Sequence, residues 1–549
     1  MFLSHILFLY EPCLNAVKSA SMKWTLFFLL TITISFLPSC QKTEPKEKPA
    51  YGGHLTIGHY SPIDIINPIV SNSGTSGFLT VIIFNGLVKP DENFNIVPDL
   101  AYKWETSKDG LRWIFYLRKG VKFHDNRELT AEDVKFTYDL IKTPEYRGYY
   151  TQFFEPVKQV NIIDPYTIEI VLNKPYSPLL SGLIAGILPK HIYEGRDLRN
   201  PEVNKHPIGT GPFKVLEYSS SEAILEANRD YFDGRPFLDK ITFRIFKNQN
   251  ILFAKMMDET VDVIHETNPE NIDILKQVTY FKNYKFLRPF YYILPFQNKG
   301  IFKDKRVRIA LNFAVNKKAL LENVLKNDGE IAFGTIYPDS WAFNKTIKPY
   351  PYNPRKALKL LHEAGWKDTN NNNILDKDGV ELEFTVLFKE GFAVDEKSLK
   401  HIQVDLYRIG VSISGKKHST KKFNNFVMKK EFDSILIALV GRGDPDNNYA
   451  FWHSSQTASG YNFFSYKNEK IDKYLEEGRR AFDINMRKKL YFKFQEEIFS
   501  DPPGIFLFWA NSLFVIHERF KNVKIHPSWM FDIKDWYVPE SSRQGTGDR

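Results

Sequence analysis

The chain has 549 residues, of which 43% are hydrophobic and 25% are charged, and its formal net charge is +9. This length exceeds what a single hydrophobic core usually serves, so we expect two or three domains. The composition is that of an ordinary globular protein, which argues against a disordered chain and against a protein with several membrane spans. The positive charge is spread along the sequence and is not gathered in one basic arm, which argues against a nucleic-acid-binding protein.

The N-terminal region has the features of an export signal. Met22-Lys23 is followed by an apolar run of about 14 residues that ends at Leu37. A run of this length is too short to span a bilayer, which takes about 20 residues, but it suits the core of a signal peptide. We therefore predict that residues 1–39 are a signal region, with Met22 as an alternative start of translation to Met1.

The apolar run ends in Leu37-Pro38-Ser39-Cys40, which resembles a lipobox, where a cysteine is lipidated and becomes the first residue after cleavage. An ordinary export signal with cleavage nearby is the alternative interpretation. Residues 40–50 are charged and contain proline, as expected of a tether. We therefore predict a protein of the cell envelope that is held by a lipid on Cys40 at the periplasmic or extracellular face of a membrane.

Residues 111–142 predict a strand followed by a helix. Every second residue of the segment 111–118 is large and apolar, which is the period of a half-buried strand. These apolar residues are Trp113, Phe115 and Leu117. Thr130 precedes Ala-Glu-Asp, so its hydroxyl can cap a helix while Asp133 reaches back to the Thr130 amide. The apolar face of this helix would consist of Val134, Tyr138 and Ile141.

Further elements are predicted by the same rules. Paired glycines precede a short strand at residues 54–58, and side chains alternate again along residues 166–172. Asn353, with a proline after it, would cap a helix that Gly365 ends. Residues 305–315 predict another helix, whose apolar face would consist of Val307, Leu311, Ala314 and Val315.

Two loops look like ligand sites but lack residues that such sites need. Gly209 and Gly211 are not followed by the Gly-Lys-Ser/Thr of a phosphate loop, so we interpret them as turn residues with positive φ. Residues 368–379 carry polar side chains at alternating positions, as in a calcium loop. Asn373 stands where that loop demands glycine and Gly379 where it demands glutamate, so a polar hairpin is the favoured interpretation.

Several segments together resemble the family 5 solute-binding proteins, the extracytoplasmic receptors of oligopeptide and dipeptide ABC importers. In chain order, the matching segments are WETSKDGLRWIFYLRKGVKFHDNRELTAEDVKF (104–136), PIGTGPF (207–213), NRDYFDGRP (228–236), KRVRIALNFAV (305–315) and LLHEAGW (360–366). The resemblance covers about residues 50 to 540, because motifs of the family continue to the closing helices.

The resemblance implies an α/β fold of the two-lobed periplasmic-binding-protein type (class II-like, cluster C), with an extra α/β domain and the ligand enclosed between the lobes. Residues 51–90, 207–290 and 505–540 would form lobe I. Residues 91–206 would form the extra domain II, and residues 291–504 would form lobe II, the third domain.

The function implied by the resemblance is that of a receptor that binds a peptide or peptide-like solute and delivers it to the membrane subunits of an ABC permease. We expect a monomer that needs no cofactor, binds no metal or nucleic acid and is not an enzyme. One alternative is the same receptor fold with a non-peptide solute, such as a metal chelate, haem or an oligosaccharide. An exported hydrolase is less favoured, because the sequence shows no Gly-x-Ser-x-Gly, no helix-borne histidine pair and no nucleophilic cysteine.

Peptide-binding members of the family hold the ligand's ammonium group through an aspartate, four residues before the proline of a Trp-x-x-Asp-x-x-x-Pro segment. Counting back from Pro445, the tryptophan position is Ala438 and the aspartate position is Gly441. Both expected side chains are missing, although a one-residue shift of the alignment would restore an acid. Arg442 is a candidate for binding an anion such as a ligand carboxylate, and a solvated loop charge is the alternative.

Two other segments are expected near the ligand. Residues 71–77 (SNSGTSG) lie where lobe I of the family approaches it, and residues 292–298 lie beside the crossover between the lobes. For each aromatic residue, packing in the core is the alternative role. Asp444 and Asp446 are expected to cap the following helix. The residues that we predict to bind the ligand are Ser71, Asn72, Thr75, Tyr292, Phe296, Asn298, Val440, Gly441, Arg442 and Asp444.

Overall fold

The computed structural model describes residues 48–549 except 72–73, 92–94, 147, 266, 268–270, 442, 526–531 and 543–549. The predicted signal region, the start at Met22 and the lipidation site Cys40 therefore lie outside the described residues, as do Asn72 and Arg442. Everything described below belongs to the unit Pro49–Arg549. Within the described part of the chain, no helix is both long enough and apolar enough to cross a membrane.

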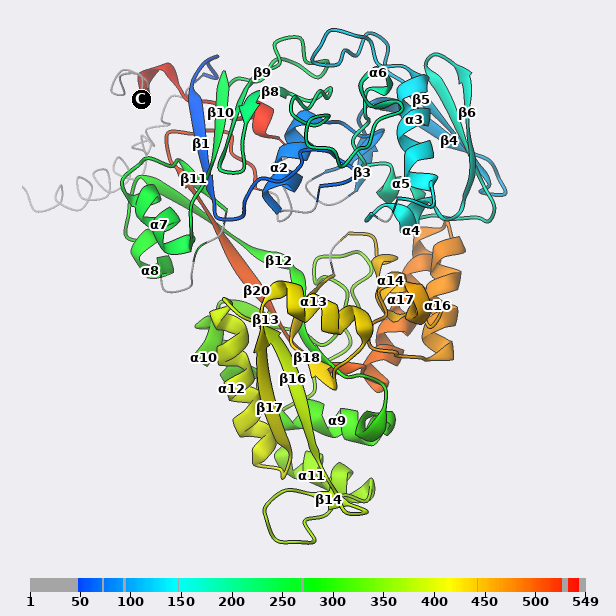
Figure 1. Ribbon diagram of the computed structural model, residues 1–549, viewed down its shortest axis with the longest axis vertical. Coiled ribbons are helices and arrows are strands. Elements are labelled where there is room, and N and C mark those ends of the chain that lie inside the picture. Colours follow the sequence, from blue (N-terminus) through cyan, green and yellow to red (C-terminus); the bar gives the residue numbers. More distant parts are fainter. Residues whose placement is uncertain are drawn as a thin grey trace, which may run out of the picture. The chain divides into compact units, whose positions relative to one another are not determined.

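A large mixed β-sheet extends from lobe I into lobe II (Figure 1). Its strands in spatial order are β19 (Ile437–Val440), β12 (Phe281–Pro295), β20 (Gly504–His517), β11 (Val263–Ile264), β1 (His54–His59), β10 (Lys240–Ile245), β9 (Glu222–Ala227) and β8 (Phe213–Tyr218), with β13 (Gly329–Ile331) paired to β20. β1 runs parallel to both β10 and β11, and the other pairs are antiparallel. We use lobe I, domain II and lobe II below for the residue ranges given above.

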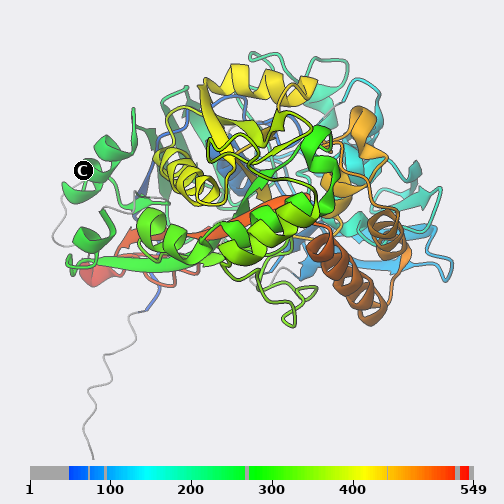
Figure 2. The same ribbon diagram turned by 90° about the horizontal axis from the view of Figure 1, so that it is seen from below.

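The strands β12 and β20 carry the chain between lobe I and lobe II. They pair from Phe281 opposite His517 to Pro295 opposite Gly504, with a shift of register between Leu287 and Tyr291. At one end β20 also pairs with β11 of lobe I, and at the other end β13 and β19 of lobe II join the sheet. Both views show β20, in orange, as one long strand (Figure 1 and Figure 2). The lobes are therefore joined by a pair of long strands whose ladder of backbone pairs is interrupted near its middle, with a second shift of register between Tyr292 and Ile293.

Domain II and lobe II each have a further sheet. In domain II the antiparallel order is β4 (Ala101–Thr106), β5 (Arg112–Leu117), β7 (Thr167–Leu172) and β6 (Val157–Asp164). In lobe II the parallel order is β17 (Ser412–His418), β16 (Glu383–Lys389) and β18 (Ser434–Ile435). Two short hairpins complete the strands: β2 (Val88–Pro90) with β3 (Ile96–Pro98), and β14 (Asp376–Lys377) with β15 (Val380–Glu381).

Helices flank these sheets. In lobe I and domain II they are α2 (Gly74–Ile83), α3 (Ala131–Lys142), α4 (Thr151–Phe154), α5 (Leu179–Gly182), α6 (Lys190–Tyr193), α7 (Gln249–Met257) and α8 (Ile272–Leu275). In lobe II they are α9 (Lys305–Ala314), α10 (Lys317–Leu325), α11 (Pro354–Glu363), α12 (Ala393–Tyr407), α13 (Thr420–Lys429), α14 (Asn447–Trp452), α15 (Gln456–Ser459), α16 (Glu469–Arg480) and α17 (Ile484–Ser500).

The predicted strand and helix of residues 111–142 are confirmed as β5 and α3. The alternating apolar side chains of β5 are buried, as are the apolar residues of α3: Trp113, Phe115, Leu117, Val134, Tyr138 and Ile141. The Thr130 hydroxyl accepts a hydrogen bond from the Glu132 amide at 3.3 Å, and the Asp133 carboxylate accepts one from the Thr130 amide at 3.0 Å. The capping box therefore starts the helix where the sequence predicts it.

Predicted elements of lobe II are also confirmed. α9 and α11 form, and the Asn353 side chain accepts a hydrogen bond from the Lys356 amide at 2.9 Å, with proline at the first helical position. Gly365 ends this helix with a φ of +97°. The segment 368–379 belongs to the hairpin of β14 and β15, and the Asp368 carboxylate accepts backbone hydrogen bonds within its loop.

The prediction for Gly209 and Gly211 is wrong, because neither residue has a positive φ. The end of α2 instead approaches them closely. A Cβ on Gly209 would fall on the carbonyl oxygen of Ile83, and one on Gly211 on the carbonyl oxygen of Ile82. These glycines are therefore required by backbone-to-backbone contact and not by a special turn conformation.

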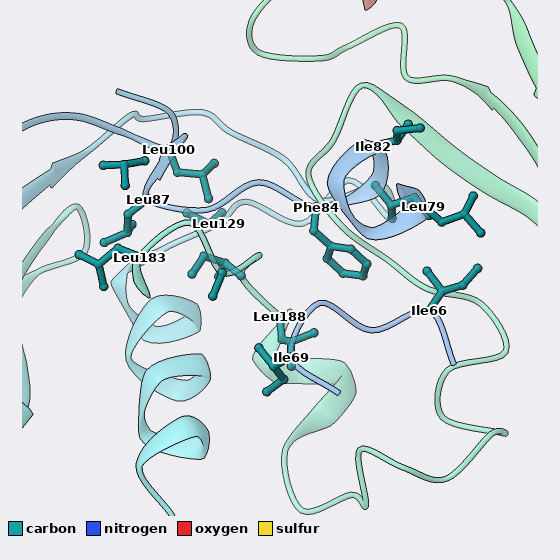
Figure 3. Close-up of a cluster of buried hydrophobic side chains, with 14 of the residues drawn as sticks. Ile66, Ile69, Leu79, Ile82, Phe84, Leu87, Leu100, Leu129, Leu183 and Leu188 are labelled. Carbon is teal, nitrogen blue, oxygen red and sulfur yellow. The ribbon is translucent and has the colours of Figure 1, made fainter. Parts of the chain in front are cut away.

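Lobe I and domain II share one hydrophobic core. A single cluster of buried side chains includes residues of β1, α2, β5, α3 and β7. Figure 3 shows part of it, with the labelled residues Ile66, Ile69, Leu79, Ile82, Phe84, Leu87, Leu100, Leu129, Leu183 and Leu188. Two other clusters fill lobe II, and a smaller one lies under α7 and α8. Lobe I and domain II are thus packed together, while the two clusters of lobe II also take in residues of β20, such as Leu507 and Trp509.

Candidate functional site

The segment around Gly441 lies at the crossover between the lobes. Val440 pairs with Phe290 of β12, at the end of β19. The Gly441 amide donates to the Pro289 carbonyl at 2.9 Å, and the Gly441 carbonyl accepts from the Tyr337 amide at 3.0 Å. The backbone of this predicted ligand-binding segment is therefore held on both sides by lobe II and the crossover strand.

Trp509 of β20 occupies the space in which a side chain at position 441 would lie. A Cβ on Gly441 would collide with the indole ring of Trp509 and would be 2.6 Å from the Thr335 carbonyl oxygen. The indole is buried, with ring centroids 5.3 Å from Tyr291 and 5.4 Å from Tyr337. Position 441 therefore carries no carboxylate, and the packing of Trp509 leaves no room for one.

Asp444 is engaged by an arginine of α17. Its two carboxylate oxygens accept hydrogen bonds from Arg487 at 2.7 and 3.1 Å, and one of them also accepts from the Asp446 amide at 2.9 Å. Both side chains are largely buried, with 14% and 8% exposed. The prediction that the Asp444 side chain caps the following helix is therefore wrong, because α14 has no side-chain cap and the main partner of Asp444 is a distant guanidinium group.

The prediction that the Asp446 side chain caps the following helix is wrong. Asp446 precedes α14 but makes no capping hydrogen bond with its side chain. One carboxylate oxygen accepts from the hydroxyl of Tyr176 in domain II at 2.9 Å, and the other lies 3.0 Å from Nε of Arg479. Burial raises the pKa of Asp446 to about 6, against the opposing effect of Arg479. The Asp446 carboxylate thus contacts Tyr176 and Arg479, in distant parts of the chain, and does not cap α14.

In lobe I, Ser71 and Thr75 hold the loop between β1 and α2. The Ser71 hydroxyl donates to the carbonyls of Ile65 and Asn67, at 2.5 and 2.7 Å. The Thr75 hydroxyl donates to the Ser61 carbonyl at 2.7 Å and is 2.8 Å from Nδ1 of His59. Thr75 therefore holds the end of β1, and Ser71 holds the loop that follows it.

The predicted residues of the 292–298 segment pack into lobe II. The Tyr292 ring stacks on Phe508 at 4.7 Å, and the buried Phe296 ring stacks on Phe302 at 4.3 Å. The Asn298 amide donates to the Phe464 carbonyl at 2.9 Å. Of the predicted site, the structure brings together Val440, Gly441 and Asp444 in one segment, with Tyr292 on the neighbouring strand, while Ser71 and Thr75 lie in lobe I.

Comparison with known proteins places the chain in a family. The model of the bacterial extracellular solute-binding proteins, family 5, matches residues 95–461. The chain belongs to this family. The oligopeptide-binding protein AppA of Bacillus subtilis is 31% identical to this family 5 protein over 548 residues, which is 95% of this chain and 99% of AppA.

Solved structures of family 5 relatives confirm the predicted two-lobed α/β fold. The structure of AppA from Bacillus subtilis in complex with a nonapeptide is 31% identical and has a TM-score of 0.78, covering 89% of this chain and all of AppA. NikZ from Campylobacter jejuni in complex with Ni(L-His) is 30% identical and has a TM-score of 0.80, covering 88% of this chain and 99% of NikZ.

Sequence reasoning did not single out a group of half-buried rings in this family 5 protein. His59 is the last residue of β1 and His265 directly follows β11, so both lie at the carboxyl ends of these parallel strands, where open α/β sheets bind ligands. Phe78 of α2 contacts both rings, at centroid distances of 6.1 Å from His59 and 4.9 Å from His265. The signal available in the sequence was a histidine at the carboxyl end of each short apolar strand.

Two hollows lie on lobe II. One, of about 430 Å³, is lined by Lys299, Thr385, Leu387, Lys416, His418, Phe426, Glu431, Phe432 and Asp433. The other is an open depression along α11. Among the residues that the structure describes, no cluster of three or more histidine, cysteine or acidic side chains could hold a metal ion. Neither hollow contains a predicted ligand-binding residue.

Proposed function

We propose that this protein is the extracytoplasmic receptor of an ABC importer, which binds peptides or peptide-like solutes and delivers them to the permease without chemically changing them. The observation that supports this proposal is the similarity to the oligopeptide-binding protein AppA over 95% of the chain, including a relative's structure with a bound nonapeptide. The relative and this chain share both lobes, so the whole ligand-enclosing unit is available for the same task.

The ligand would be held between lobe I and lobe II next to the crossover strands. We propose that Val440, Gly441 and Asp444 border it from lobe II, and that the loop of Ser71 and Thr75 borders it from lobe I. Extended peptides can be recognised through their backbone, which suits the strand ends β19 and β12 at this place. The side chains of Tyr292, Phe296 and Asn298 would support the segment of Val440 and Gly441 through their packing within lobe II.

A metal chelate is the second candidate ligand. NikZ, whose structure is in complex with Ni(L-His), is 30% identical to this chain, which is close to the 31% of AppA. In addition, the buried Trp509 leaves no room at Gly441 for a carboxylate that could neutralise a peptide's ammonium group. This steric feature is the observation that favours a ligand without a free amino end.

Two measurements distinguish the candidates. Mass spectrometry of the small molecules that co-purify with the protein would identify the resident ligand. Thermal unfolding with an equimolar mixture of tri- to nonapeptides, and separately with nickel and histidine, would then test each class, because a ligand at about 100 times its dissociation constant adds about 2.7 kcal/mol of stability. Stabilisation by peptides supports the first candidate, and stabilisation by nickel and histidine alone supports the second. No stabilisation by either, with no co-purified solute, would contradict both.

We also propose that the mature protein is a monomer anchored through a lipid on Cys40. The apolar run that ends in Leu37-Pro38-Ser39-Cys40 supports the lipid anchor. Growth of bacteria that express the full chain with radiolabelled palmitate should label the wild type and leave Cys40→Ser unlabelled. The Cys40→Ser variant should move from the membrane fraction to the soluble fraction. A wild type that remains unlabelled would contradict the anchor while leaving the receptor function untouched.

A further inference from the structure

The C-terminal end of α16 in lobe II touches domain II at a place where the chain does not cross between them. In both views α16 and α17, in orange to brown, lie beside the strands of domain II (Figure 1 and Figure 2). Residues 176–177 of domain II contact Arg479, and the turn at Gly110 contacts Phe482. We name this contact, formed by Gly110, Trp113, Tyr176 and Ser177 with Asp446, Arg479 and Phe482, the α16 contact.

Domain II completes the hydrogen bonding of the last turn of α16. The final carbonyls of a helix have no partner within it. The Arg479 carbonyl accepts a hydrogen bond from the Ser177 amide at 2.8 Å, and the Ser177 hydroxyl is 3.3 Å from the same oxygen. A residue of another part of the protein therefore caps this helix.

The same contact encloses an ion pair. The side chains of Asp446, Arg479 and Tyr176 are almost fully buried. The Arg479 guanidinium group lies over the rings of Tyr449 and Tyr176, at 3.7 and 4.9 Å. Because a buried ion pair is costly unless its atoms are hydrogen-bonded, the Tyr176 hydroxyl contributes by donating to Asp446 at 2.9 Å. If domain II moved away, the pair would lose this donor and be exposed to water.

A ring inserts beside this polar part. Phe482, in the turn between α16 and α17, packs against Gly110 so closely that a Cβ there would collide with its ring. Its centroid is 5.9 Å from Trp113 of β5. Gly110 has a φ of +71°, so the turn needs glycine for its conformation and for this close approach. The contact is therefore complementary in shape as well as in hydrogen bonding.

We propose that the α16 contact forms when the lobes close around the ligand, and that it sets ligand affinity although its residues do not touch the ligand. This inference rests on the proposed receptor function. The chain passes between the lobes through β12 and β20 and not through the α16 contact. The contact therefore consists of non-covalent interactions and can separate as the lobes open. A contact made in the closed form alone shifts the opening equilibrium by its own free energy, and the apparent affinity shifts with it.

Two substitutions test the contact with little disturbance to either part. Tyr176→Phe removes only the hydroxyl, and Phe482→Ala removes a ring that is 45% exposed. Binding of the stabilising probe, which is the peptide mixture or nickel with histidine, should weaken by about 10- to 100-fold in Tyr176→Phe, the range for a lost hydrogen bond to a charged group. In Phe482→Ala it should weaken by about 2- to 10-fold, the range for a lost aromatic contact. The loss should appear as faster dissociation, because association does not depend on a contact made after closure. Tyr102→Phe and Met486→Ala, at exposed positions of domain II and α17, are matched controls and should bind like the wild type.

Hydrogen–deuterium exchange of the Ser177 amide reports the contact directly. In the wild type, this amide should be protected in the presence of ligand and should exchange faster after the ligand has been removed. In Tyr176→Phe the protection with ligand should be reduced, while the melting temperature without ligand should stay close to that of the wild type. Equal protection of Ser177 with and without ligand would overturn the proposal, since the contact would then be permanent.

The failure of the proposed function would look different. In that case neither probe would bind the wild type and no solute would co-purify with it. Hydrogen–deuterium exchange of the Ser177 amide would then be compared between the protein as purified and the protein after unfolding and refolding. A Ser177 amide that stays protected in both samples would again overturn the α16 contact as a closing device.

Discussion

The indole of Trp509 lies directly against the Cα of Gly441, where any side chain at position 441 would have to be placed. The two residues are 68 positions apart in the chain but adjacent at the crossover, because β19 and β20 both pair with β12. Tyr337 and Tyr291 pack against the same indole. The predicted ligand-binding segment around Gly441 is therefore backed by a buried aromatic side chain.

Gly441→Ala should destabilise the protein by about 1–3 kcal/mol, because the added methyl group overlaps a buried ring that cannot move freely. Denaturant unfolding would measure this change. Gly334→Ala is the control, since a Cβ there meets no atom within 4 Å. If Trp509→Leu makes room, the cost of Gly441→Ala should fall in the double variant. Equal costs of Gly441→Ala in both backgrounds would show that Trp509 is not the obstacle.

Asp444→Ala should destabilise the protein by about 3–5 kcal/mol, because it leaves the buried guanidinium group of Arg487 without its carboxylate partner. The double variant Asp444→Leu, Arg487→Met should recover much of this loss, since it removes both charges. Urea unfolding of the wild type and the two variants would test this. If Asp444→Ala kept its stability and lost only ligand binding, Asp444 would act on the ligand and not on Arg487.

Lys317 should make stability depend on pH. Burial lowers the pKa of this lysine to about 7, and its ammonium group lies 3.4 Å from the Asn312 side-chain oxygen. In the unfolded chain the pKa is about 10.4, so the unfolded state binds more protons between the two values and stability rises with pH in that window. The penalty is fully present below pH 7 and falls away as the pH rises towards about 10.4.

The substitution Lys317→Met should therefore raise the free energy of unfolding at pH 6 to 7 by about 2 kcal/mol or more and flatten the rise between pH 7 and 10. Unfolding at several pH values would show this. Lys318→Met, at the neighbouring exposed position of α10, should change neither quantity. A Lys317→Met variant that is less stable than the wild type at pH 7 would contradict the prediction.

Gly209→Ala should be among the most damaging single substitutions, with a cost of about 3 kcal/mol or more, because the methyl group would meet the Ile83 carbonyl oxygen and force two backbone segments apart. Gly74→Ala, at the open start of α2, should be nearly neutral. Expression yield and melting temperature would be compared for the two variants. Similar melting temperatures would show that the loop at Gly209 adapts.

Several elements could be predicted from the sequence because the physics that forms them is local. The period of Trp113, Phe115 and Leu117 specifies a strand with one buried face, and Thr130 with Asp133 specifies where a helix starts. Both depend on residues within a few positions of each other, so no knowledge of the fold is needed. The order of motifs along the chain likewise indicated the family that the comparisons show.

Other features were decided by tertiary structure, because they depend on residues that are distant in the chain. Gly209 is required by the carbonyl of Ile83, and Asp446 bonds with Tyr176, which lies 270 positions earlier. A local pattern predicted a positive φ for the first and a helix cap for the second, and both predictions were wrong. The residues that would hold a ligand stay predictions for the same reason. The sequence by itself determined the local elements and the family, while only the packing of distant segments decided which side chains are buried, paired or excluded at the crossover.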